Sequence, residues 1–290
     1  MSELLSELLV PFSYDYMVKA MWVSALVGAV CAFLSAYLML KGWSLMGDAL
    51  AHSIVPGVAA AYIIGAPFAI GAFFAGILAA LAMTFVKAHT RLREDAVIGL
   101  VFTTLFALGL LLASIWPTSV SIQTIVLGNI LAISDEDAIQ VVAIAAVSLA
   151  VMAFIWKDLM VTFFDENHAR SIGIKAGLLK IVFFTLLSAC TVAALQTVGA
   201  CLVIAMVVTP GATAYLLTDR FGWLIVIAVA LGAVTSFAGA YLSYFLDGAT
   251  GGVIVTLQTL VFLAVFYLAP KHGLIAARRR VRSPAEAAAA

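Results

Sequence analysis

The stretch WLIVIAVALGAVTSFAGAYLSYFL, residues 223–246, contains no charged side chain. About 20 consecutive apolar residues are enough for one α-helix to cross the hydrocarbon core of a bilayer. A helix also satisfies its own backbone hydrogen bonds, which lipid cannot satisfy. This stretch therefore predicts a transmembrane helix.

The same pattern recurs along nearly all of the 290 residues. The sequence is 65% hydrophobic and 10% charged, with a mean hydropathy of +1.17. A soluble domain cannot hide that much apolar surface. We therefore expect an all-α polytopic membrane protein with about eight or nine transmembrane helices, at residues 18–40, 45–64, 67–87, 95–115, 138–157, 178–198, 200–218, 223–246 and 251–269.

The positions of Lys and Arg test this count, because cytoplasmic loops carry an excess of positive residues. Nine spans with an external N-terminus place all of the 15 Lys and Arg residues except Lys19 on the cytoplasmic side. The apolar segment 121–133 is too short to span. If it were a span, the Lys and Arg residues would no longer gather on one side of the membrane. We expect it to be a half-helix or a helix outside the bilayer.

These assignments divide the chain into three parts. Residues 1–17 form an external N-terminal segment, and residues 18–270 form a transmembrane domain with a long cytoplasmic loop at 158–176. Residues 271–290 form a cytoplasmic tail that is basic and of low complexity. We interpret its basic run as a cytoplasmic anchor, so we expect contact with the lipid bilayer and no nucleic-acid partner.

Asp48 and His52 are costly exceptions within the second apolar segment. Residues four apart on a helix share one face, with Cβ atoms about 5–6 Å apart. At about 1.5 Å per residue from Lys41, His52 lies about 16 Å along the helix, close to the middle of a core about 30 Å thick. A carboxylate and an imidazole at this depth predict a functional site and resemble half of a metal site.

Three interpretations of this pair are open. It can be a structural pair between helices, a proton relay, because histidine titrates near neutrality, or a metal site. Mixed nitrogen and oxygen donors suit Mn²⁺, Fe²⁺ or Zn²⁺. Two ligands are too few for such an ion, so the others must come from another helix or another chain. We favour a two-fold arrangement with a second, related membrane subunit.

Two prolines are expected to break helices near this site. Proline has no N–H, so Pro56 should leave the carbonyl of His52 without its helical partner. That carbonyl, the imidazole and the carboxylate would then converge on one region. Pro210 lies near the middle of the seventh span and is expected to kink it. The kink can face the pathway or serve helix packing alone.

The long cytoplasmic loop has room for a helix of its own. Asp165 or Asn167 can cap a short helix that runs to Ile172, and Gly173 is suited to end it. Such a helix is suited to docking into a cleft of a partner protein, and a solvated connector is the alternative. The chain has no G-x-x-x-x-G-K-[ST] motif and no enzyme or haem signature, so we expect neither ATP hydrolysis by a P-loop of its own nor another enzymatic activity.

Three motifs resemble those of the metal-specific permeases of bacterial ABC importers, the ABC-3 type. They are GDALAHS at 47–53 followed by Pro56 and Gly57, FDENHARSIG at 164–173, and VGACLVIAMVVTPGATA at 198–214. The resemblance covers essentially residues 15–280. Within the family, the chain is most similar to a permease subunit of the manganese/iron importers of Gram-negative bacteria.

The resemblance implies a type II-like ABC importer permease fold in the bacterial inner membrane, with a periplasmic N-terminus and a cytoplasmic C-terminus. It implies transport of Mn²⁺ or Fe²⁺ into the cytoplasm with no permanently bound cofactor. The implied partners are a second permease subunit, identical or paralogous, a cytoplasmic ABC ATPase dimer and a periplasmic metal-binding protein. A zinc importer permease of the same family and, from a different class, a proton-coupled secondary metal carrier are the alternatives.

The resemblance also assigns residues to roles. Asp48 and His52 become the transmembrane metal ligands. The ATPase would dock on a coupling helix formed by Asp165, Glu166, Asn167, His168, Ala169, Arg170 and Gly173.

Overall fold

The computed structural model describes residues 7–43, 45–116, 130–269 and 273–274, and this part of the chain is helical and contains no β-strand. The helices are η1 (Val10–Ser13), α2 (Asp15–Lys41), α3 (Met46–Ser53), α4 (Val55–Ile64), α5 (Phe68–His89), α6 (Glu94–Ile115), η2 (Ile130–Ala132), α8 (Asp135–Phe164), α9 (Glu166–Ser171), α10 (Ala176–Val198), α11 (Ala200–Leu217), α12 (Phe221–Leu246) and α13 (Thr250–Leu268).

The predicted apolar segments correspond to these helices. Eight described segments are long and apolar enough to cross a membrane, and Ala205–Leu217 within α11 is a shorter apolar helix. The expectation of about eight or nine spans is therefore confirmed. The second span consists of two helices, α3 and α4, and α8 extends beyond the expected 138–157 at both ends. Most of the segment 121–133 and of the tail 271–290 lies outside the described residues.

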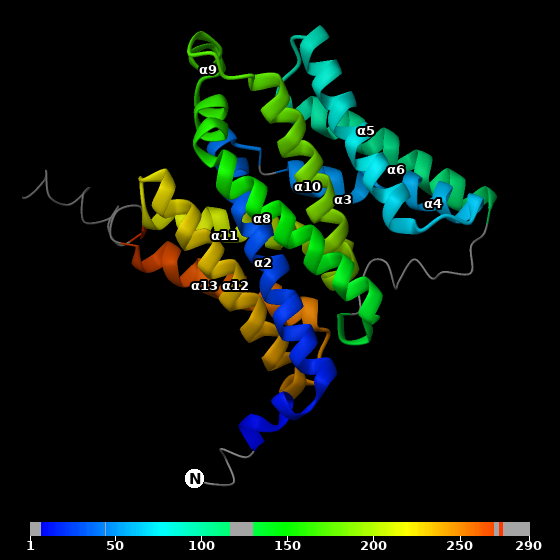
Figure 1. The fold of residues 1–290 in the computed structure, drawn as a ribbon, viewed down its shortest axis with the longest axis vertical. Helices are drawn as coiled ribbons and strands as arrows, with labels where there is room; N and C mark the ends of the chain where they lie inside the picture. The colour runs from blue at the N-terminus through cyan, green and yellow to red at the C-terminus, as the bar shows by residue number, and fades with distance from the viewer. Residues whose placement is uncertain (1–6, 44, 117–129, 270–272, 275–290) are drawn as a thin grey trace, which may run out of the picture.

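Helix α2 is the central element of the larger group of helices in Figure 1, where it packs against α8, α10, α11 and α12. It is apolar on every side, as expected of a helix surrounded by others. Tyr37 near its end is fully buried, and its hydroxyl donates to the backbone carbonyl of Trp156 in α8 at 2.9 Å. The rings of Phe163 and Phe183 contact the Tyr37 ring edge to face.

Glycines allow the closest helix crossings. A Cβ atom added to Gly28 of α2 would lie 2.4 Å from the carbonyl oxygen of Gly232 in α12. One added to Gly57 of α4 would lie 2.1 Å from that of Gly71 in α5. Backbones approach this closely only where no side chain intervenes, which is typical of helix packing in membranes.

Helices α3 to α6 form a second group beside the α2 bundle (Figure 1). Helix α3 connects the two groups, because it packs against α5 and α6 on one side and against α10 and α11 on the other. The short helix α9 and the turn between α5 and α6 lie at the same end of the molecule. This arrangement places α3 at the junction of the two groups and α9 at one end of them.

Candidate metal site and coupling helix

Asp48 and His52 lie on one face of α3, as their spacing predicts. His52 Nε2 lies 3.2 Å from Asp48 Oδ1, and 25% of the His52 side chain and 32% of the Asp48 side chain are exposed. The two atoms are in contact, but their geometry does not form a hydrogen bond. Asp48 Oδ1 is therefore a buried oxygen without a hydrogen-bond partner among the described residues. Such an oxygen is costly unless a cation or a donor compensates it.

The imidazole of His52 packs against helix α6. Its ring centroid lies 5.6 Å from that of Phe102 and 5.4 Å from that of Phe106. The two rings restrict the orientation of the imidazole and shield one side of it from water, as an apolar shell does around a metal ligand. At the start of α3, a Cβ atom on Gly47 would lie 2.9 Å from Val207 of α11, so the glycine permits close packing there as well.

The ligand count of this pair is incomplete. Within residues 7–43, 45–116, 130–269 and 273–274, no group of three or more His, Cys, Asp or Glu side chains is placed to hold a metal ion. Ions such as Mn²⁺, Fe²⁺ and Zn²⁺ take at least four ligands. Asp48 and His52 can supply two of them, and the origin of the others stays a prediction.

The helix break predicted at Pro56 is present, and the carbonyl of His52 lacks its usual partner at residue 56, but the expectation that this carbonyl is free is wrong. Helix α3 ends at Ser53, and Pro56 lies in the first turn of α4, where a missing N–H leaves no bond unmade. We expected the carbonyl of His52 to be free, yet it accepts a hydrogen bond from the N–H of Ile54. A tight turn at Ile54 precedes the proline, and the N–H of Ile54 replaces the missing donor to this carbonyl.

Pro210 lies inside α11 and does not end it. The N–H of Gly211 donates to Ser35 Oγ of α2 at 3.0 Å, and Ser35 Oγ donates to the carbonyl of Val208 at 3.1 Å. A serine of a neighbouring helix thus satisfies backbone groups beside the proline, as is common in membrane helices. This contact favours helix packing as the role of Pro210, and its proximity to a pathway stays a prediction.

The loop 158–176 contains the short helix that the sequence predicts. Helix α9 begins after Asp165, whose Oδ1 accepts the N–H groups of Asn167 at 2.9 Å and His168 at 3.0 Å. Asp165 is therefore the N-cap. Gly173 follows the helix with a φ of +86°, a left-handed conformation that favours glycine. Ala169 is buried, whereas Asn167, His168 and Arg170 are exposed.

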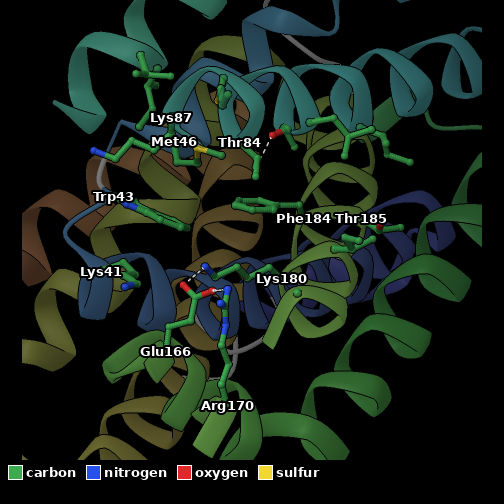
Figure 2. Close-up of a pocket in the computed structure, with 18 residues that line it drawn as sticks. Lys41, Trp43, Met46, Thr84, Lys87, Glu166, Arg170, Lys180, Phe184 and Thr185 are labelled. Carbon is green, nitrogen blue, oxygen red and sulfur yellow. Dashed lines mark hydrogen bonds and ion pairs between the residues drawn. The ribbon is translucent and has the colours of Figure 1, made fainter. Parts of the chain in front are cut away.

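Glu166 joins α9 to α10. Its carboxylate accepts hydrogen bonds from Arg170 Nη2 at 2.6 Å and from Lys180 Nζ of α10 (Figure 2). The hydrogen bond from Lys180 is the main reason that the pKa of Glu166 lies below its usual value. Hydrogen bonds between charged groups therefore hold the short helix α9 against the long helix α10.

Sequence reasoning missed the partners that come from distant helices. Phe102 and Phe106 are four residues apart on α6, so their spacing places them on one helix face. It does not predict that this face packs against His52. Lys180 was assigned to the cytoplasmic side, without any indication that it meets Glu166. Ser35 is one of several serines in apolar segments, and only the fold brings it to Pro210.

Comparison with known proteins identifies the group to which this arrangement belongs. The chain is 71% identical over 279 residues to the chelated iron transport system membrane protein YfeC of Yersinia pestis, covering 96% of this chain and 95% of that protein. It is 47% identical over 273 residues to the manganese transport system membrane protein MntB of Synechocystis, covering 94% and 89%. Among solved structures, PsaBC from Streptococcus pneumoniae in complex with Fab superposes with a TM-score of 0.83 at 33% identity, covering 92% of this chain and 97% of that one.

The model of the ABC 3 transport family matches residues 13–269. The match contains helices α2 to α13, the Asp48/His52 pair and the capped helix α9. The chain therefore belongs to the ABC 3 transport family.

Proposed function

We propose that this chain is the transmembrane permease subunit of an ATP-binding-cassette importer that moves Mn²⁺ or Fe²⁺ into bacterial cells. Family membership and the names of the relatives, one for chelated iron and one for manganese, support a metal importer. The observation that carries the proposal is the Asp48/His52 pair, whose carboxylate oxygen and imidazole nitrogen lie 3.2 Å apart within a segment long and apolar enough to cross the membrane.

The pair would bind the metal in transit. Asp48 would supply an oxygen ligand and a negative charge, and His52 a nitrogen ligand, a set that suits Mn²⁺ and Fe²⁺. Phe102 and Phe106 would keep the imidazole in place while the ion is bound. Because one chain offers two ligands, a second permease subunit, identical or paralogous, would complete the site. A shared site also lets the ion leave when the subunits move apart.

The energy for transport would come from a separate ATPase dimer. The exposed face of α9, with Asn167, His168 and Arg170, would dock on that ATPase. Glu166 connects α9 to α10, and α10 packs against α3, which carries the metal pair. These contacts offer a continuous packed path from the docking helix to the metal ligands.

The remaining parts of the proposal concern orientation and delivery. The Lys and Arg distribution supports an inner-membrane protein with its N-terminus in the periplasm and its C-terminus in the cytoplasm. A periplasmic metal-binding protein would then deliver the ion to the face opposite α9.

Metal-resolved uptake in cells lacking this chain tests the proposal. Uptake of radioactive manganese and iron should fall, zinc uptake should stay unchanged, and the intact gene should restore both. Loss of zinc uptake alone would instead support the zinc permease. Uptake that survives inactivation of the ATPase and collapses with a proton uncoupler would support the secondary carrier.

A further inference from the structure

A cavity of about 620 Å³ opens between the end of α2 and helices α3, α5, α6, α9 and α10, at the end of the molecule where α9 lies (Figure 2). Its size falls within the range of small-molecule sites. It is distinct from the metal pair, because neither Asp48 nor His52 lines it. We propose that this cavity binds an anionic phospholipid of the cytoplasmic leaflet. The inference rests on the proposed orientation of the chain and not on the transported ion.

The walls of the cavity are mostly apolar. Ile77 and Leu81 of α5, Ile98 of α6 and Ile181 of α10 contribute aliphatic side chains, and those of Leu81 and Ile181 are more than half exposed. The rings of Trp43 and Phe184 stack with centroids 5.7 Å apart. A free phosphate ion gains nothing from such walls, whereas an acyl chain buries its methylene groups against them.

The cavity also carries an excess of positive charge. Its lining contains four cationic side chains, Lys41, Lys87, Arg170 and Lys180, and a single carboxylate, Glu166, which gives a net charge of +3. Figure 2 shows Lys41, Arg170 and Lys180 on one side of the stacked Trp43 and Phe184 rings, and Lys87 on the other. This charge repels a divalent metal ion and attracts a phosphate group. Basic pockets between membrane helices on the cytoplasmic side are suited to anionic headgroups.

The depth of the cavity matches one leaflet. Lys41 lies at the end of α2, Lys87 in the last turn of α5, and Lys180 in the second turn of α10, so the cations gather at helix ends. On α5 the apolar lining extends from Lys87 back to Ile77, which is roughly 15 Å at 1.5 Å per residue. Half of a hydrocarbon core of about 30 Å has the same length. A headgroup beside the cations would thus leave its acyl chain beside the apolar wall.

Gly177 provides a variant that fills the cavity. It lines the cavity in the first turn of α10, and a Cβ atom added to it meets no atom within 4 Å. Gly177→Phe should therefore fold and occupy the space that the acyl chain needs. Gly252→Phe on α13 is the matched control, because its added Cβ also meets open space and it does not line the cavity.

The test is native mass spectrometry of the full-length chain, purified from membranes with the chains that co-purify with it. Phosphatidylglycerol and phosphatidylcholine with identical acyl chains are the probes. We expect phosphatidylglycerol to bind at least about fivefold more tightly, because the attraction of one lysine for an anionic headgroup raises the affinity by about fivefold. Lys41→Gln combined with Lys87→Gln should lower phosphatidylglycerol binding to the level of phosphatidylcholine. Gly177→Phe should lower the binding of both lipids.

Lys157→Gln combined with Arg220→Gln is the charge control, because these residues were assigned to the same side and do not line the cavity. It should leave lipid binding unchanged. Equal binding of the two lipids to the wild type would overturn the proposal, as would full binding to both cavity variants. Displacement of the lipid by millimolar inorganic phosphate would overturn it in favour of a free-phosphate site. None of these outcomes depends on metal uptake, so the failure of this proposal and that of the transport proposal are distinguishable.

Discussion

His52 Nε2 lies 3.2 Å from Asp48 Oδ1 across one turn of α3, yet the two side chains do not complete a hydrogen bond. A pair whose only role was to join helices would be expected to satisfy its buried oxygen, because an unsatisfied acceptor costs about 1–3 kcal/mol. The oxygen instead stays without a donor among the described residues. An oxygen with a free lone pair is compatible with the proposed role of this pair as metal ligands.

The contact between His52 and Phe106 predicts that Phe106→Ala weakens metal binding. The smaller side chain leaves the imidazole free to rotate, and loss of such support typically costs about 10–100-fold in metal affinity. The concentration dependence of manganese uptake would show a raised apparent KM. Phe106→Leu, which keeps an apolar wall, should have a smaller effect. An unchanged KM in Phe106→Ala would contradict the positioning role of this ring.

The cap of α9 predicts that Asp165→Ala lowers ATP-driven uptake. Removal of an N-cap side chain destabilises a helix by about 1 kcal/mol, and α9 is too short to tolerate that loss. Asp165→Asn should retain most of the activity, because asparagine also caps. Asp158→Ala removes an exposed acid from the end of α8 and serves as the control. Equal uptake by the alanine and asparagine variants would argue against capping.

The pKa of Glu166 predicts how the attachment of α9 to α10 depends on pH. A carboxyl whose pKa is lowered on folding stabilises the folded arrangement above its usual value of about 4.3 for glutamate. That stabilisation is lost as the pH falls through the lowered, folded-state pKa. Spin labels at Ser171 and Leu178 should thus report a constant distance from about pH 7 to about pH 5, and a broadened one below about pH 4.

Glu166→Gln should give the broadened distance at every pH, because the glutamine carries no charge for Lys180 and Arg170. Glu136→Gln, an acid at the start of α8, should behave as the wild type. A distance that already broadens near pH 6, or a Glu166→Gln variant that stays ordered, would contradict the proposed attachment.

The crossing of Gly57 and Gly71 predicts a folding defect. In Gly57→Ala the new Cβ would lie 2.1 Å from the carbonyl oxygen of Gly71. The obstacle is backbone, so α4 and α5 must separate, at a cost of about 1–3 kcal/mol. The folded fraction, measured by fluorescence-detected size-exclusion chromatography, should fall. Gly99→Ala, whose Cβ meets open space in α6, should not lower it. Normal folding of Gly57→Ala would show that this crossing is looser than the structure indicates.

Local patterns predicted the features that depend on local chemistry. Apolar length located the spans, and the Asp165 and Gly173 signals located α9 and its ends, because both depend on residues within a few positions. The i, i+4 spacing also placed Asp48 and His52 on one face.

Features that depend on other helices could not be predicted in this way. The donor to the His52 carbonyl comes from a tight turn at Ile54, whose geometry the proline pattern does not specify. Ser35, which satisfies the backbone beside Pro210, lies in a helix about 170 residues away in the chain. Lys180 contacts Glu166 only because α9 and α10 pack together. The cavity combines residues of six helices, so no sequence window contains it.

Manganese and iron uptake by Asp48→Ala and His52→Ala variants tests the central claim most directly. The measurement uses cells lacking the natural chain, with each variant present in the membrane at the wild-type amount. Each substitution should abolish most of the uptake of both ions, because it removes one of the two ligands proposed for this chain. Normal manganese and iron uptake in both variants would contradict the assignment of Asp48 and His52 as the metal site.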